Sequence, residues 1–185
     1  MREVKKIVFL LSITFSLCGY SQLSHKLENM LEEENPQFSD YEQTHYDATE
    51  YIFENPGDLS SNEFRSALKI IDFWKNQDTG INVPIFGAFY DSLESKSNLR
   101  YFYMIAIAHY ILGERINNER YLTCVKIPGE TYSEQADVRE VQLEGAKILL
   151  NYVSNKASKL KINKEAKPYL EAYQNNELED SFFKN

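Results

Sequence analysis

Cysteine, glycine and proline are all scarce in this chain, and each shortage excludes a class of protein. The 185 residues contain two cysteines, seven glycines and five prolines. Cys18 lies in an N-terminal segment that we expect to be removed, which leaves Cys124 as the single thiol and excludes a disulfide framework. Few glycines and prolines, with 14% aromatic residues, exclude collagen-like and low-complexity chains and favour a helical globular protein.

Sequence motifs that commonly carry catalysis are also missing. There is no glycine-rich phosphate loop, no Gly-x-Ser-x-Gly elbow, no His-Glu-x-x-His helix and no Cys-x-x-Cys pair. Glu42-x-x-His45 is half of a di-iron bundle motif, but such a site needs a second copy, and neither His25 nor His109 follows a glutamate at that spacing. We therefore predict no catalytic residues, no metal site and no cofactor.

Basic residues are rare in one part of the chain. Residues 22–58 hold ten acidic side chains and a single lysine, a net charge of −9, whereas residues 59–185 hold 17 acidic and 16 basic side chains. An acidic surface repels phosphate backbones, so nucleic acid is not an expected partner. One interpretation of these acidic residues is a solvated helix face. The other is a surface that attracts a basic partner protein, with Glu42, Asp47 and Glu50 as the candidate residues.

The first 21 residues have the pattern of a secretory signal peptide. Three basic residues precede an apolar run over residues 7–17, and residues 19–21 place small side chains where signal peptidase reads them. We expect cleavage before Gln22 and a periplasmic or extracellular protein without a transmembrane segment. Acylation of Cys18 is an alternative, disfavoured because the bulky Leu17 precedes it.

A mostly apolar stretch over residues 99–113 is the segment around which we expect the chain to fold. It contains no proline, its strongly polar side chains are Arg100 and His109, and it ends at Gly113, a residue type that often terminates helices. A helix without a polar face is typical of the centre of a bundle. His109 is then either a hydrogen-bonded core residue or the lining of a pocket.

Periodicity and capping residues predict the helices around this one. Ser39 and Ser60 each stand three residues before a glutamate, which predicts capping boxes, and Ser133 is the expected cap of a later long helix. Gly145 predicts the close approach of a neighbouring helix, and Pro168 favours a late start for the last helix. The expected additional helices cover residues 23–34, 39–54, 60–77, 84–93, 133–155 and 163–173.

These patterns predict an all-α fold, a single-domain irregular bundle of about five to seven helices. The expected divisions are a signal peptide over residues 1–21, an acidic arm or short helix over 22–37, a helical domain over 38–175 and a polar tail over 176–185.

Residues 114–132 are the least regular part of the predicted mature chain, and we expect a long loop there. Residues 121–127 are β-branched and aromatic enough for a short extended segment. Long loops commonly carry function; alternatively, this one is a lid packed over the end of the bundle. The candidate contact residues are Tyr121, Leu122 and Tyr132, because aromatic side chains dominate binding hot spots.

The segment Tyr101–Glu171 resembles a known family. An aromatic-rich helix ends in Tyr110-Ile111-Leu112-Gly113, a loop contains Cys124-Val125-Lys126-Ile127-Pro128-Gly129, and Thr131 and Gln135 precede a long helix. This order is similar to periplasmic immunity proteins that protect bacteria from type VI secretion effectors attacking peptidoglycan. The second cysteine that pairs with the loop cysteine in that family is missing here, and both the Cys–Pro and the Thr–Gln spacings differ. The resemblance implies an exported helical protein that binds another protein.

Two function classes follow from the sequence. The first is a non-enzymatic protein-binding module of the immunity or inhibitor kind. The second is a small helical ligand-binding protein or enzyme with a pocket near His109. The missing catalytic motifs favour the first, and the oligomeric state stays open.

Overall fold

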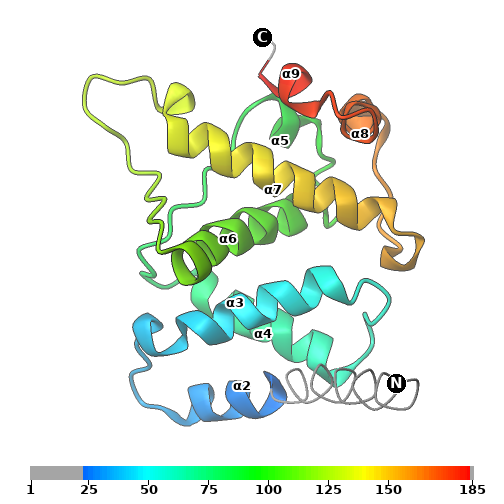
Figure 1. The fold of residues 1–185 in the computed structure, drawn as a ribbon. Coiled ribbons are helices and arrows are strands. Elements are labelled where there is room, and N and C mark those ends of the chain that lie inside the picture. The colour runs from blue at the N-terminus through cyan, green and yellow to red at the C-terminus, as the bar shows by residue number, and fades with distance from the viewer. Residues whose placement is uncertain (1–22, 184–185) are drawn as a thin grey trace, which may run out of the picture. The chain divides into compact units, whose positions relative to one another are not determined.

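The computed structural model describes residues 23–183, and this part of the chain is all-α, as predicted (Figure 1). The predicted signal peptide and its cleavage site lie outside the described residues. No strand is present over residues 23–183, and none of the helices there combines the length and apolar character needed to cross a membrane. The α-helices are α2 (Leu23–Glu32), α3 (Phe38–Glu54), α4 (Asn62–Lys75), α5 (Ala88–Ser92), α6 (Leu99–Asn118), α7 (Ala136–Ser154), α8 (Lys167–Gln174) and α9 (Leu178–Phe182).

The chain divides into two compact units. The described residues of the first are 23–52 and 58–77, and those of the second are 53–57 and 78–183. The second unit also contains three short 3-10 helices, η1 (Tyr132–Glu134), η2 (Lys156–Ser158) and η3 (Lys164–Ala166).

Three helices build the first unit, and two of them share an aromatic cluster. The Phe38 and Tyr41 rings of α3 lie 5.2 and 5.9 Å from the Trp74 ring of α4. Polar contacts join α2 to both neighbours: the Ser24 hydroxyl donates to Glu63 at 2.9 Å, and Lys26 pairs with Asp47 at 2.6 Å. The segment expected to be an acidic arm or a short helix is therefore a docked helix over residues 23–32.

Two predicted capping boxes are wrong. Ser61, not Ser60, is the N-cap of α4, and its hydroxyl accepts the Phe64 N–H at 3.0 Å. The reason is a turn in which the Ser61 N–H donates to the carbonyl of Asp58, so the helix begins one residue later than expected. Ser39 lies inside α3, which already begins at Phe38.

The second unit is organised around the seam between α6 and α7, which lie against each other (Figure 1). Gly145 of α7 sits so close to α6 that an added Cβ would meet Ile107 Cγ1 at 2.5 Å, which confirms the predicted close approach. The buried Tyr103 hydroxyl crosses the same seam and donates to the carbonyl of Gln142 at 2.9 Å. The apolar stretch predicted to be central therefore occupies the core of this unit.

The predicted end of this helix at Gly113 is wrong. α6 continues to Asn118, and the chain leaves it at Glu119, a C-cap with φ 54° in the left-handed region. Gly113 is therefore an ordinary helical residue, and of the five helical residues after it Asn117 and Asn118 are exposed while the other three are half-buried. The loop expected over residues 114–132 begins at Glu119, and no strand forms over residues 121–127.

The ends of the later helices also differ from expectation. α7 begins at Ala136, after η1 and Gln135, instead of at Ser133. α8 begins at Lys167 with Pro168 in its first turn, which confirms the late start. The tail expected to be polar contains α9, because Leu178 is buried and Phe182 packs 5.4 Å from the Phe89 ring.

Candidate protein-binding loop

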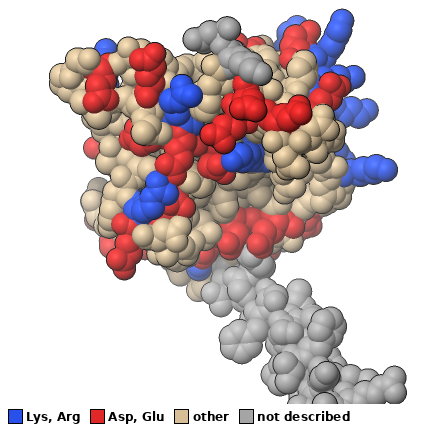
Figure 2. Space-filling view, turned by 45° about the horizontal axis from the view of Figure 1, so that its top comes forward, with Lys and Arg blue, Asp and Glu red and all other residues tan. Residues whose placement is uncertain are grey.

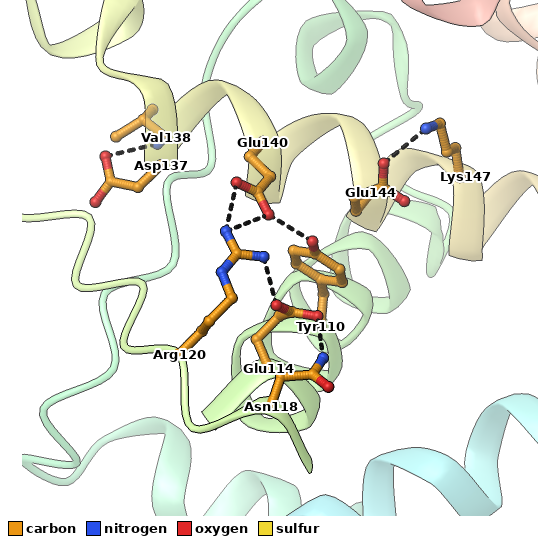
Figure 3. A network of polar contacts seen from close by, with 9 residues as sticks. All are labelled: Tyr110, Glu114, Asn118, Arg120, Asp137, Val138, Glu140, Glu144 and Lys147. Atoms are coloured by element: carbon orange, nitrogen blue, oxygen red, sulfur yellow. Dashed lines mark hydrogen bonds and ion pairs between the residues drawn. The ribbon is translucent and has the colours of Figure 1, made fainter. Parts of the chain in front are cut away.

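The loop between α6 and η1, residues 119–131, is held at its base by a network of charged groups (Figure 3). Arg120 donates through Nη2 to both carboxylate oxygens of Glu140 at 2.9 Å, and through Nη1 to Glu114. Tyr110 donates its hydroxyl to Glu140 at 2.6 Å, and Asn118 donates to Glu114 at 2.8 Å. We call this the Arg120 network; it ties the first residues of the loop to α6 and α7 together.

The pKa values of the network agree with its geometry. Burial alone would raise the pKa of Glu140, but the hydrogen bonds from Arg120 and Tyr110 outweigh it and hold that pKa below its usual value. The same bond to Glu140 raises the pKa of Arg120. Burial, followed by the bond to Glu140, raises the pKa of Tyr110. At neutral pH the Glu140 carboxylate therefore faces the Arg120 guanidinium in a charge-assisted contact with fixed geometry.

Side chains from other elements fix the middle of the loop by its backbone. The Cys124 N–H donates to Asp137 Oδ2 at 2.8 Å, and the Cys124 carbonyl accepts the Tyr132 hydroxyl at 2.9 Å. Asn82 donates to the carbonyl of Thr123 at 2.8 Å. Cys124 has φ 47°, an unusual conformation for a non-glycine residue that these bonds maintain.

Cys124 is also the most buried residue of the loop. The residue is 2% exposed. Burial, with smaller contributions from the charges of Asp137 and Glu140, raises the pKa of the thiol to about 12. The nucleophilic form of cysteine is the thiolate, and the Cys124 thiol stays protonated at neutral pH. Cys124 therefore serves as a packed residue and not as a nucleophile.

Apolar side chains project from the supported loop in alternation with buried ones. Tyr121, Val125 and Ile127 are 70%, 56% and 48% exposed, whereas Leu122 and Cys124 are 7% and 2% exposed. The Arg115 guanidinium lies 5.4 Å from the centre of the Tyr121 ring. A single exposed apolar residue is ordinary, but three within seven residues of one anchored loop are a local concentration of exposed apolar surface.

Only one of the three loop residues predicted from the sequence projects from this surface. Tyr121 is exposed as expected. Leu122 is buried, so its expected role as an exposed anchor is wrong; the in–out alternation of an extended segment turns it inward. Tyr132 is half-buried, with its ring 5.5 Å from Phe86 and its hydroxyl on Cys124, so it supports the loop.

Sequence reasoning missed Val125 and Ile127 as exposed members of the loop. The signal that could have found them is the same alternation, counted from Tyr121. It also missed the Arg120 network, whose members are up to 30 residues apart in the sequence.

The predicted acidic residues Glu42, Asp47 and Glu50 all lie on α3, in the first unit, and are half-buried. Asp47 accepts hydrogen bonds from Lys26 at 2.6 Å and from Gln43 at 2.8 Å. Glu50 accepts the Tyr46 hydroxyl at 3.2 Å. The Lys26 pair compensates part of the charge of this face.

His109 packs within the second unit. Its ring lies 5.7 Å from the Phe53 ring, and burial lowers its pKa to about 4, so the imidazole is neutral at physiological pH. A hollow beside Phe53 is lined by Pro56, Asn151, Tyr152, Ser154 and Asn155, and His109 is not part of its lining. Within residues 23–183 no group of three His, Cys, Asp or Glu side chains is placed to hold a metal ion.

No protein-family model matches the chain, and comparisons with curated proteins and with solved structures find no match either. The similarity of Tyr101–Glu171 to immunity proteins therefore stays a prediction. The geometry of the loop is the main evidence on function.

Proposed function

We propose that this chain is a non-enzymatic protein-binding module that contacts its partner through loop 119–131. The observation that carries the proposal is the exposure of Tyr121, Val125 and Ile127 on a loop with an anchored backbone. Ordering a mobile loop on binding costs conformational entropy, and an anchored loop avoids most of that cost. Exposed aromatic and aliphatic side chains then supply the buried contact that dominates binding energy.

The class of partner comes from two expectations. The signal peptide would export the protein, and the resemblance of Tyr101–Glu171 to type VI immunity proteins suggests an exported toxic effector as the protein bound. The net charge of −9 over residues 22–58 supports a basic partner, because opposite charge steers association. Glu42, Asp47 and Glu50 are the proposed steering residues, with Asp47 weakened by its pair with Lys26.

The proposal is tested by capturing a partner from periplasmic extract, identifying it, and measuring its affinity for loop variants. Replacing Tyr121, Val125 and Ile127 with serine should weaken binding at least about thirtyfold, the scale of hot-spot truncation. Helicity should stay unchanged, because these side chains are exposed. The matched control replaces Leu31 and Ile85, exposed at 59% and 41% outside the loop, with serine, and should bind like the wild type.

A second arm of the experiment tests steering. The variant Glu42→Lys, Asp47→Lys, Glu50→Lys should mainly slow association, and only at low salt, since exposed charges are screened beyond the Debye length. A partner that binds the loop variant as tightly as wild type would show that the contact surface lies elsewhere. Turnover of a cell-wall or small-molecule substrate by the pure protein would overturn the non-enzymatic class.

A further inference from the structure

The segment between α7 and α8 carries a concentration of positive charge in an acidic protein. Four exposed lysines of this segment and the exposed lysine that begins α8 form what we call the lysine strip: Lys156, Lys159, Lys161, Lys164 and Lys167. Glu165 lies within the strip and Glu94 borders it, so the local net charge is +3, whereas the whole chain carries −8. Figure 2 shows basic side chains projecting together from the right-hand edge, the side on which Figure 1 places α8.

The backbone beneath the lysine strip is fixed to the second unit. Ser158 and Ala166 are fully buried, and both lie between strip lysines in the sequence. Asn163 donates to the carbonyl of Ser92 at 2.7 Å and accepts the Glu94 N–H at 3.3 Å. Lys159 and Lys161 alternate with the half-buried side chains of residues 160 and 162. The lysines therefore project from a supported surface, while their neighbours face the core.

Two of these lysines stand where a helix does not favour positive charge. Lys164 and Lys167 begin η3 and α8, where the helix dipole places partial positive charge, and α8 has no acidic residue in its first turn. Glu165 accepts a hydrogen bond from Asn163 at 2.8 Å. Over residues 23–183, none of the five strip lysines forms an ion pair. Positive charge at the start of α8 breaks the usual rule for helix ends, and such exceptions are expected at functional sites.

We infer that the lysine strip docks the protein on an anionic lipid bilayer. The strip contains no arginine and residues 156–167 contain no aromatic residue, so it lacks the bidentate donors and stacking rings with which proteins bind nucleic acid. Lysines act as point charges, which suits the diffuse negative charge of lipid headgroups. The acidic residues elsewhere do not prevent this contact, because charges beyond about 8 Å are largely screened at physiological salt.

The test is co-sedimentation with vesicles of phosphatidylcholine alone and of phosphatidylcholine mixed in equal parts with phosphatidylglycerol. The wild type should bind the mixed vesicles only, and raised salt should release it. Each lysine near headgroups contributes about fivefold to the partition coefficient, so the variant Lys159→Gln, Lys161→Gln, Lys164→Gln should bind roughly a hundredfold more weakly. All proteins tested carry the same N-terminal segment, so its contribution cancels between variants.

The matched control removes the same charge from α4, where Arg65, Lys69 and Lys75 are exposed. The variant with glutamine at these three positions should bind the mixed vesicles like the wild type. Equal losses in both variants would show that only net charge matters, and no binding of the wild type to mixed vesicles would also overturn the inference. Binding of soluble polyglutamate as tightly as of vesicles would assign the strip to an acidic protein instead.

Discussion

Gly145→Ala should destabilise the protein, although the same change usually stabilises a helix. In the middle of a helix, alanine is favoured over glycine by about 0.5–1 kcal/mol. Here the added Cβ would lie 2.5 Å from Ile107 Cγ1, 3.1 Å from its backbone nitrogen and 3.2 Å from its Cα. Ile107 is fully buried and β-branched, so its side chain has little freedom to move away.

The magnitude follows from two opposing terms. Overpacking of a filled core costs about 1–3 kcal/mol, because α6 and α7 must separate or side chains must leave their rotamers. Subtracting the gain in helix propensity leaves an expected loss of about 1 kcal/mol in the free energy of unfolding, within a range of about 0–2.5 kcal/mol. The change in stability is expected to be a loss because overpacking at the α6–α7 seam outweighs the gain in helix propensity.

The assay is urea denaturation followed by circular dichroism, for Gly145→Ala, Ile107→Ala and the double variant. Ile107→Ala removes Cγ1, so Gly145→Ala should cost less in that background, by about 0.5–1 kcal/mol or more. Gly57→Ala is the control, because its Cβ would meet Ala157 Cβ at an ordinary 3.6 Å. A Gly145→Ala protein as stable as the wild type would refute the reasoning.

Three further predictions test the loop and the first unit. Cys124 should react with a thiol reagent slowly in the folded protein and fully in denaturant, since the pKa of its thiol is raised to about 12 by burial; rapid native labelling would contradict its packed role. Arg120→Ala should speed proteolysis within residues 119–131 without loss of helicity, because it removes the contacts to Glu114 and Glu140; an unchanged cleavage rate would mean that the Arg120 network does not hold the loop. His45 has a pKa lowered from 6.5 to about 4 by burial, so the unfolded chain binds its proton first, and the free energy of unfolding should fall as the pH drops from 6.5 toward 4, by up to about 1.4 kcal/mol per pH unit. Burial lowers the pKa of His109 to about 4 as well, so His45→Leu should make the fall shallower and leave the part due to His109. An equally steep decline in the variant would assign the fall to other groups.

The parts of the fold that local pattern determines could be predicted from the sequence. The apolar stretch after Leu99 predicted the central helix, and Pro168 predicted the late start of α8, because each depends on residues close together in the sequence. Gly145 predicted a close approach of a neighbouring helix, but not that Ile107 of α6 is the residue it meets. The end of α6 was misjudged because glycine terminates a helix only where the chain turns to positive φ, and Gly113 has no such turn.

Features that depend on distant contacts were beyond the reach of local pattern. α9 forms where Leu178 is buried and Phe182 meets Phe89, and nothing in the surrounding polar sequence indicates that contact. The Arg120 network joins residues from α6, the loop and α7, which a pattern of neighbours does not bring together. Tyr121 and Leu122 are equally good contact residues by composition, but only Tyr121 is exposed. Composition alone does not say which face of an extended segment points outward.

The supports of the loop have a consequence for how such a protein can change. Asn82, Asp137 and Tyr132 hold the loop by the main-chain atoms of residues 123 and 124, and main-chain atoms are present whatever the side chain. Substitutions at Val125 or Ile127 therefore alter the outward chemistry and leave the scaffold in place. Under the proposed binding role, a lineage carrying this loop can diversify what it recognises faster than how it folds, just as an engineer could randomise the same positions to build a library.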